Sequence, residues 1–267
     1  MSVVAAQQAE DYRRALNQLA TVSFAQAKAL LSQIEDANPI LFRDRLLEAF
    51  PLVAAPYMTA AGDLSAAWYE EMRAESVGGS YAASSAVESA PEAMESLVRY
   101  AVTPLFQGSS STVLGLLAGG MQRLVANGAR DTIYDNVMAD RVRVGYARIP
   151  RSGCCAFCGL LASRGAAYNS AASAGSVVGA GVDASVTRGK VGGQGKGVKA
   201  RGNQALGRRF HDFCQCIAMP VFQGDTFHKD VVSKYEKLYE DSFEVNEGGA
   251  ISAKATLASW RQVHGTK

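Results

Sequence analysis

The residues with the clearest chemical potential form a split cluster of cysteines around one histidine. The first half is Cys155-Ala-Phe-Cys158, and the second half is His211-Asp-Phe-Cys214-Gln-Cys216. Together the halves hold four of the five cysteines of the chain, and the fifth, Cys154, adjoins the first half. Thiolates combined with an imidazole are the ligands that a tetrahedral Zn²⁺ site uses. The spacing therefore predicts a metal site closed between two distant segments.

The first half can supply two ligands because a Cys-x₂-Cys turn lets both thiolates reach one ion. The second half then offers three candidates for two remaining positions. We favour Cys216 over Cys214 as the last ligand because Cys216 opens a predicted strand and can point inward. Cys154 is expected to be a bystander. The expected zinc ligands are therefore Cys155, Cys158, His211 and one of Cys214 and Cys216.

A metal site is not the only state in which these cysteines could exist. They are also compatible with small buried hydrophobic residues, or with a disulfide pair in an oxidised particle. A catalytic zinc fits less well, because such a site keeps an open position and uses more histidine and carboxylate ligands. The sequence contains neither a Gly-x-Ser-x-Gly motif nor a P-loop. We therefore expect a structural zinc and no enzyme activity, with no catalytic residue and no other cofactor.

The composition is that of a globular protein, with 48% hydrophobic and 19% charged residues in a chain of 267. No apolar run reaches the roughly 18 residues that a membrane-spanning helix needs. The first residues lack the basic and apolar regions of a signal peptide. We therefore expect a reducing compartment, in which clustered thiols favour metal over disulfide, and no membrane partner.

The net charge of +2 conceals a strong asymmetry along the chain. Residues 1–140 hold 9 Lys and Arg against 16 Asp and Glu, whereas residues 141–211 hold 12 against 1. Non-specific contact with double-stranded DNA would explain this basic segment, and a solvated loop is the alternative. Residues 188–209 lack the aromatic residues that stack on bases, so sequence-specific recognition is not expected. The candidate DNA contacts are Arg188, Lys190, Lys196, Lys199, Arg201, Arg208 and Arg209.

Hydrophobic periodicity predicts helices in the first 141 residues, with breaks at Pro39, Pro51 and Pro56. The glycines of the predicted helix 114–125 are expected to allow close helix packing. Two short strands follow, at 142–150 and 216–222, and Pro220 places the second at an edge. Two helices, 226–239 and 253–264, complete the chain. The helices expected before residue 142 cover 5–34, 41–50, 63–75, 89–101, 114–125 and 129–141.

These elements predict an α+β fold, with a helical N-terminal region and a small zinc-stapled module that contains the strands. We expect the boundaries 1–141 for the helical region, 142–225 for the cysteine–histidine module, and 226–267 for a C-terminal helix and tail. Residues 170–207 consist mainly of Ala, Ser, Gly, Val, Lys and Arg, which predicts a flexible basic insertion within the module.

Several segments around the cluster resemble minor capsid proteins of tailed phages of actinobacteria. The same pattern is similar to the wider Mu-F-like head morphogenesis group, in which a Cys-x₂-Cys segment precedes a His-x₂-Cys-x-Cys segment. Residues 68–73 and 122–125 also resemble the helical half of those proteins, so the resemblance covers about residues 60–225. The segments that carry it are 146–150, 155–158, 161–165, Tyr168, 210–216 and 219–222.

The resemblance implies a structural virion protein, present in few copies and associated with the portal inside the phage head. It also implies a role in head assembly and DNA ejection, late expression, and a passage through the host cytoplasm during assembly. The expected partners are the portal or other head proteins and double-stranded DNA, with no small-molecule substrate. Some relatives are labelled capsid maturation proteases, which makes cleavage of scaffold or capsid protein the alternative function.

Overall fold

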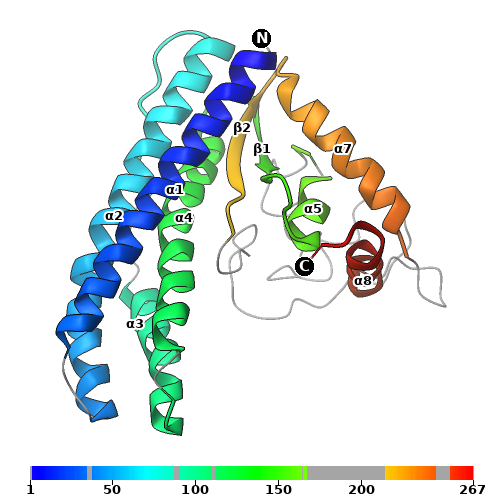
Figure 1. Ribbon diagram of the computed structural model, residues 1–267. Helices are drawn as coiled ribbons and strands as arrows, with labels where there is room; N and C mark the ends of the chain where they lie inside the picture. Colours follow the sequence, from blue (N-terminus) through cyan, green and yellow to red (C-terminus); the bar gives the residue numbers. More distant parts are fainter. Residues whose placement is uncertain are drawn as a thin grey trace, which may run out of the picture.

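The computed structural model describes residues 2–34, 38–86, 91–109, 112–163, 165–166, 214–244 and 253–266. Its outline resembles an inverted V (Figure 1). Long helices form one arm, the two C-terminal helices and a short helix that packs on them form the other, and a small sheet lies between the arms. His211 and the expected basic insertion, residues 170–207, lie outside the described residues.

The first arm is a layer of helices in which α1, α2 and α4 pack against one another, and α3 packs on α2 and α4. Apolar side chains repeat every three or four residues along these helices, so each helix has one face to bury. In α3 the expected stripe of Met94, Leu97, Val98 and Ala101 is buried. The elements of this layer are α1 (Ser2–Gln33), α2 (Pro39–Ser76), α3 (Pro91–Val102), the 3₁₀ helix η1 (Thr103–Gln107) and α4 (Val113–Ala139).

The expected breaks at Pro51 and Pro56 are wrong, because α2 continues through both prolines. A proline inside a helix leaves the carbonyl four residues earlier without its N–H donor. For Pro56 that carbonyl belongs to Leu52, which is 76% exposed, so water can satisfy it. On the opposite side of the helix, Phe50 and Ala54 are fully buried and hold the turns that contain Pro51 and Pro56 against the core. Tertiary packing therefore offsets the local cost of the prolines.

Pro39 begins α2 instead of interrupting a helix. The side chain of Asn38 accepts hydrogen bonds from the backbone N–H groups of Ile40 and Leu41, at 2.9 and 3.4 Å. This arrangement is a helix N-cap followed by proline at the first helical position, where the missing N–H costs nothing.

The two segments expected at 114–125 and 129–141 form the single helix α4. The close packing predicted for the glycines of segment 114–125 is confirmed at Gly120, and Gly128, outside that segment, is packed in the same way. A Cβ at Gly120 would lie 2.0 Å from a methyl carbon of Leu97 in α3, and one at Gly128 would lie 2.9 Å from the backbone oxygen of Met58 in α2. Gly115 is different, since an added Cβ there would meet no atom within 4 Å.

The two expected strands are present as β1 (Val144–Ile149) and β2 (Ile217–Phe222), and they pair antiparallel. The register joins Val144 to Phe222 at one end and Ile149 to Ile217 at the other. Both strands contact α4, β2 also contacts α2, and β1 contacts α5 and α7. Every residue of β2 is buried, so this small sheet is covered although it has only two strands in the described part of the chain.

The second arm consists of α5 (Ala156–Ala162), α7 (Phe227–Ser242) and α8 (Ala253–His264). The last two helices confirm the prediction, whereas α5 was not expected. Its sequence Ala-Phe-Cys-Gly-Leu-Leu-Ala is compatible with a helix but too short to show a clear period. Trp260 of α8 is 2% exposed and packs with Ala156, Ala162 and Tyr235. The C-terminal helices therefore hold α5 in place.

The largest hydrophobic cluster joins the helical layer to the sheet. It contains Tyr12 of α1, Trp68 of α2 and Ile133 of α4 together with Tyr146 and Met219 from the two strands. The rings of Tyr12 and Trp68 are stacked with their centroids 4.0 Å apart. The protein is thus a mostly helical α+β structure with a small two-stranded sheet, as the sequence predicted. Within the described ranges, no helix is both long enough and apolar enough to span a membrane.

Candidate metal centre

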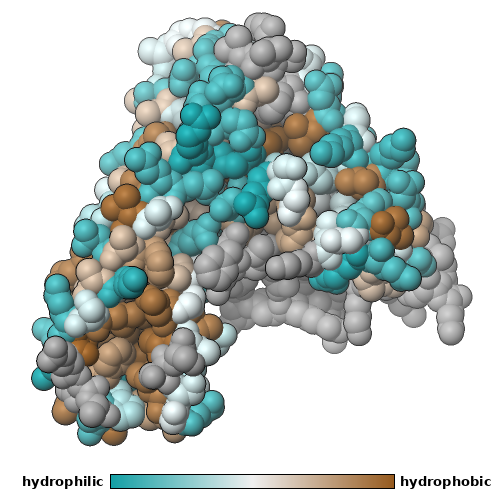
Figure 2. Space-filling view, viewed as in Figure 1, coloured by the Kyte–Doolittle hydropathy of each residue, from teal (hydrophilic) through white to brown (hydrophobic). Residues whose placement is uncertain are grey.

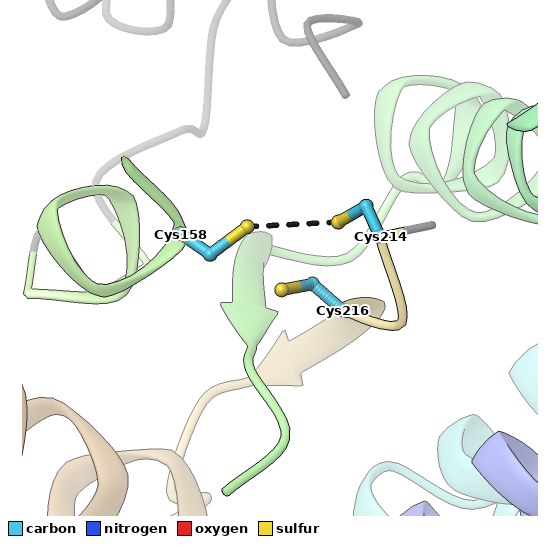
Figure 3. A group of neighbouring side chains, drawn as sticks. All are labelled: Cys158, Cys214 and Cys216. Carbon is cyan, nitrogen blue, oxygen red and sulfur yellow. Dashed lines mark hydrogen bonds between the residues drawn. The ribbon is translucent and has the colours of Figure 1, made fainter. Parts of the chain in front are cut away.

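Three cysteine sulfurs converge in the space between α5 and the start of β2 (Figure 3). The Sγ atoms of Cys158, Cys214 and Cys216 all lie within 4.8 Å of one another, and the three residues are 2, 5 and 4% exposed. Cys158 comes from α5, and the other two come from the segment that leads into β2. The sequence thus predicted correctly that the two halves of the cluster meet in space.

The distance between the sulfurs excludes a disulfide bond in this structure and is compatible with a metal site. Sγ of Cys158 and Sγ of Cys214 lie 3.5 Å apart, although the residues are 56 positions apart in the sequence. A disulfide bond is about 2.05 Å long. Two thiolates on one tetrahedral zinc are about 3.8 Å apart, since each Zn–S bond is about 2.3 Å. The observed spacing therefore fits a shared metal ion within a few tenths of an ångström.

Cys155 and Cys154 lie beside this group with different contacts. Cys155 is the N-cap of α5, and its sulfur accepts a hydrogen bond of 3.5 Å from the backbone N–H of Cys158. It packs half-buried against the three sulfurs without joining the group that lies within 4.8 Å. Cys154 instead donates to the hydroxyl of Tyr235 in α7, at 3.6 Å. Of the two, Cys155 is the better placed to approach the same ion.

The structure does not separate Cys214 from Cys216, contrary to the expectation that only one would be a ligand. Both sulfurs lie within 4.8 Å of the sulfur of Cys158, and the backbone N–H of Cys216 donates a hydrogen bond to the sulfur of Cys214. Gln215, between them, accepts a hydrogen bond of 2.7 Å from Arg151 and is not buried with them. Both cysteines of the second half are therefore placed to bind the same ion as Cys158.

The electrostatic surroundings favour a thiolate at Cys214. The pKa of this thiol lies well below its ordinary value because Cys158 and then Cys216 donate hydrogen bonds to it, and because the positive charge of Arg130 is close. The pKa of Cys158 is raised, first by its hydrogen bond with Cys155 and then by those with Cys214 and Cys216. Cys158 and Cys216 therefore keep their protons, whereas Cys214 is a thiolate. A metal ion that bound all three sulfurs would displace the two protons.

Two buried arginines donate hydrogen bonds to backbone carbonyls at the same end of the sheet. Arg130 of α4 donates to the carbonyl of Cys214 at 3.1 Å, and to the carbonyl of Cys216 at 2.7 Å through Nη2 and at 3.1 Å through Nε. Arg13 of α1 donates to the carbonyls of Ile149 and Pro150, at 3.2 and 3.5 Å. Sequence patterns did not indicate either residue, because an arginine in an amphipathic helix looks like a solvent-facing residue until its neighbours are known.

The remaining predicted site residues cannot be placed. His211 and all seven candidate DNA contacts lie outside the described residues. Among the ligands that the sequence predicted, the structure brings together Cys158, Cys214 and Cys216, with Cys155 adjacent. A fourth ligand would therefore be Cys155 or His211.

A serine–histidine contact is present at the end of α7, where Ser242 Oγ lies 3.0 Å from His264 Nε2. Ser242 is 1% exposed and donates its hydroxyl proton to the carbonyl of Leu238 at 2.8 Å. Nε2 of His264 also lies 3.1 Å from that carbonyl, so it faces two acceptors and acts as a donor. A histidine that donates cannot take the serine proton, so this pair secures α7 against α8 and is not a catalytic dyad.

Fold and site together define a helical protein with a small sheet and a buried group of thiols suited to a metal ion. The chain belongs to the VG15 protein family, a family of phage proteins, which matches residues 3–242. The phage origin implied by the resemblance is thereby confirmed. No curated protein and no solved structure matches the chain.

Proposed function

We propose that this protein is a structural component of the phage virion, a minor capsid or head morphogenesis protein whose cysteine group holds a structural zinc ion. Membership of a phage family supports the first part, and the resemblance around the cluster narrows it to the head. The observation that carries the second part is the convergence of three buried sulfurs from two distant segments.

The donor set favours zinc in a structural role. Soft thiolate ligands select Zn²⁺, Cu⁺ or iron–sulfur clusters, and zinc with Cys₄ or Cys₃His ligands is the common structural case. Cys158, Cys214 and Cys216 would hold the ion together with Cys155 or His211. Bound there, the ion supplies a cross-link between α5 and the start of β2. The thiols already lie close together and exclude water, which is the arrangement of a closed site.

The helical layer provides a surface for other head proteins. Its exposed large apolar side chains include Ile40, Leu41 and Leu52 of α2 and Phe106 of η1. Arg43 lies over the ring of Phe106 at 6.0 Å, which links η1 to the start of α2. Figure 2 shows hydrophobic surface gathered over the lower end of the helical layer. An apolar surface of this kind is typical of a protein that docks on a partner.

The uneven distribution of charge supports different partners for the two parts of the chain. Residues 1–140 carry 9 basic against 16 acidic side chains, and residues 141–211 carry 12 against 1. We propose that the helical layer contacts the portal or another head protein, and that the basic segment contacts packaged double-stranded DNA without sequence preference.

Metal analysis of the purified protein tests the zinc. We expect about one tightly bound zinc per chain in protein purified under reducing conditions, and its loss in Cys158→Ser. Cys154→Ser is the matched control, because Cys154 is a neighbouring half-buried cysteine directed at Tyr235, and it should retain the metal. Wild-type protein without metal under reducing conditions would contradict the proposal.

Location and DNA binding are tested separately. Mass spectrometry of purified virions should find the protein in intact particles and in DNA-free heads that retain the portal. Duplex binding should weaken steeply between low and high salt and disappear when residues 188–209 are deleted. Absence from particles would refute the virion role. Binding that is insensitive to salt would refute the DNA contact while leaving the portal contact in place.

A further inference from the structure

We propose that Arg130 is the residue that sets the geometry of the cysteine group. By binding the carbonyls of both Cys214 and Cys216, it fixes the backbone of that segment and keeps the two sulfurs directed toward Cys158. The inference rests on the proposed metal site and adds to it a residue of the helical layer that is not itself a ligand.

The contacts of Arg130 are those of a positioning residue. Nη2 reaches the carbonyls of Cys214 at 3.1 Å and Cys216 at 2.7 Å, and Nε reaches Cys216 at 3.1 Å. The residue is 3% exposed, so these bonds are made without competing water. The planar guanidinium presents its donors in a fixed fork, and two acceptors bound by one fork are fixed relative to each other.

The sheet explains why such a residue is needed here. The ladder between β1 and β2 ends at the pair Ile149–Ile217, so Cys214 and Cys216 lie just before the paired part of β2. Both residues are buried, and an unbonded carbonyl in a buried region is costly. Arg130 supplies the donors that a neighbouring strand would otherwise have supplied.

The consequence for the sulfurs follows from the closeness of the two carbonyls. One nitrogen, Nη2, lies within 3.1 Å of both, so the backbone on either side of Gln215 is tied to a single point. Gln215 itself bonds to Arg151 at 2.7 Å. With both carbonyls fixed, the sulfurs of Cys214 and Cys216 stay within 4.8 Å of the sulfur of Cys158.

A comparison of three variants tests the proposal. Arg130→Met keeps an unbranched side chain of similar length but removes the fork and the charge, and Arg130→Lys keeps the charge without the fork. Arg13→Met is the matched control, since Arg13 is equally buried at 5% exposed and also binds two carbonyls at this end of the sheet. Those carbonyls belong to Ile149 and Pro150 at the end of the opposite strand and not to the residues that carry the sulfurs.

Two measurements are made on each full-length protein. The first is the affinity for Co²⁺ in competition with a chelator, followed by the thiolate-to-cobalt absorption band. The second uses metal-free reduced protein and phenylarsine oxide, a trivalent arsenical that binds two thiols only when they lie close together. Thermal unfolding, recorded in parallel, reports how far each variant destabilises the fold.

We expect Arg130→Met to lower Co²⁺ affinity about 10- to 100-fold, the usual loss when a residue that orients metal ligands is removed. Arg130→Lys should fall between Arg130→Met and the wild type, because an ammonium group on a flexible stem lacks the fixed planar fork and the additional bond from Nε. Arg13→Met should bind Co²⁺ like the wild type even where its unfolding temperature is lowered. Equal affinities for all variants, or equal losses in Arg13→Met and Arg130→Met, would overturn the proposal.

Binding of phenylarsine oxide tests the positioning role of Arg130 independently of metal binding. Wild-type protein that binds phenylarsine oxide but no metal would refute the zinc proposal, and weaker arsenical binding in Arg130→Met than in Arg13→Met would still support the positioning role. Arsenical binding that is equal in both variants would refute that role. If Arg130→Met does not fold, Arg130→Lys decides the question with the same two measurements.

Discussion

Gly159 of α5 lies directly against the indole of Trp260 in α8, so closely that a Cβ added at Gly159 would stand 2.5 Å from Cζ2 of the tryptophan. Gly159 follows Cys158, and α8 begins beyond residue 242, where the family match ends. A helix outside the matched region therefore secures the segment that carries one sulfur of the candidate metal centre.

This contact predicts that Gly159→Ala destabilises the protein. The new methyl group would force Trp260, which is 2% exposed, out of its packed position, at a cost of about 1–3 kcal/mol. Replacing Trp260 by Phe in the same chain removes the obstructing ring atoms and should recover part of that loss. Chemical denaturation of the two single variants and the double variant measures the coupling, and strictly additive losses would contradict it.

The close approach of α2 and α4 predicts a second sensitive glycine. At Gly128 an added Cβ would lie 2.9 Å from the backbone oxygen of Met58, and a backbone atom can move only if the helices separate. Gly128→Ala should lower the free energy of unfolding by about 1–3 kcal/mol. Gly115→Ala, in open space on the same helix, should raise it by about 0.5–1 kcal/mol, since alanine favours the helix. Equal effects at both positions would refute the packing argument.

The carboxylate of Asp140 predicts a loss of stability in acid. Burial opposes its ionisation, but hydrogen bonds from the backbone N–H of Val142, from Arg73 and from Tyr69 hold its pKa below the ordinary value. A carboxyl group whose pKa is lower in the folded state stabilises the protein above its unfolded pKa of about 3.9. That stabilisation is lost as the pH falls through the folded pKa.

Asp140→Asn should therefore cost about 1.5–3 kcal/mol at neutral pH, the value of hydrogen bonds to a charged group. The difference from the wild type should shrink as the pH is lowered below about 4. Unfolding by urea at a series of pH values measures this convergence. Asp63→Asn, at an exposed position of α2, should follow the wild-type curve throughout. A constant difference across the series would show that Asp140 stabilises the protein through packing and not through its charge.

The fourth metal ligand can be identified by its effect on cobalt binding. Cys155 caps α5 beside the three sulfurs and receives the N–H of Cys158, a contact that suits a thiolate. We expect Cys155→Ser to weaken Co²⁺ binding and to reduce the thiolate-to-cobalt absorption, while Cys154→Ser leaves both unchanged. Loss of the metal in His211→Ala with unchanged binding in Cys155→Ser would assign the position to the histidine instead.

Local sequence patterns determined much of the architecture. The apolar stripe of α3 and the two strands could be predicted from short-range periodicity alone. Cysteine spacing predicted that Cys158 would meet the segment around Cys214, because the chemistry of ligands depends on residue type. These features need only the order of residues along the chain.

Tertiary structure decided what local pattern could not. Pro56 is tolerated inside α2 because Leu52, whose carbonyl it leaves without a helical donor, is 76% exposed, which depends on how the helix packs and not on its own sequence. The 3.5 Å between the sulfurs of Cys158 and Cys214 spans 56 positions, and the sequence does not state distances between such remote groups. Arg130 acquires its role in the same way. Its guanidinium acts on the cysteines only because the packing of α4 against the sheet brings two buried carbonyls within reach.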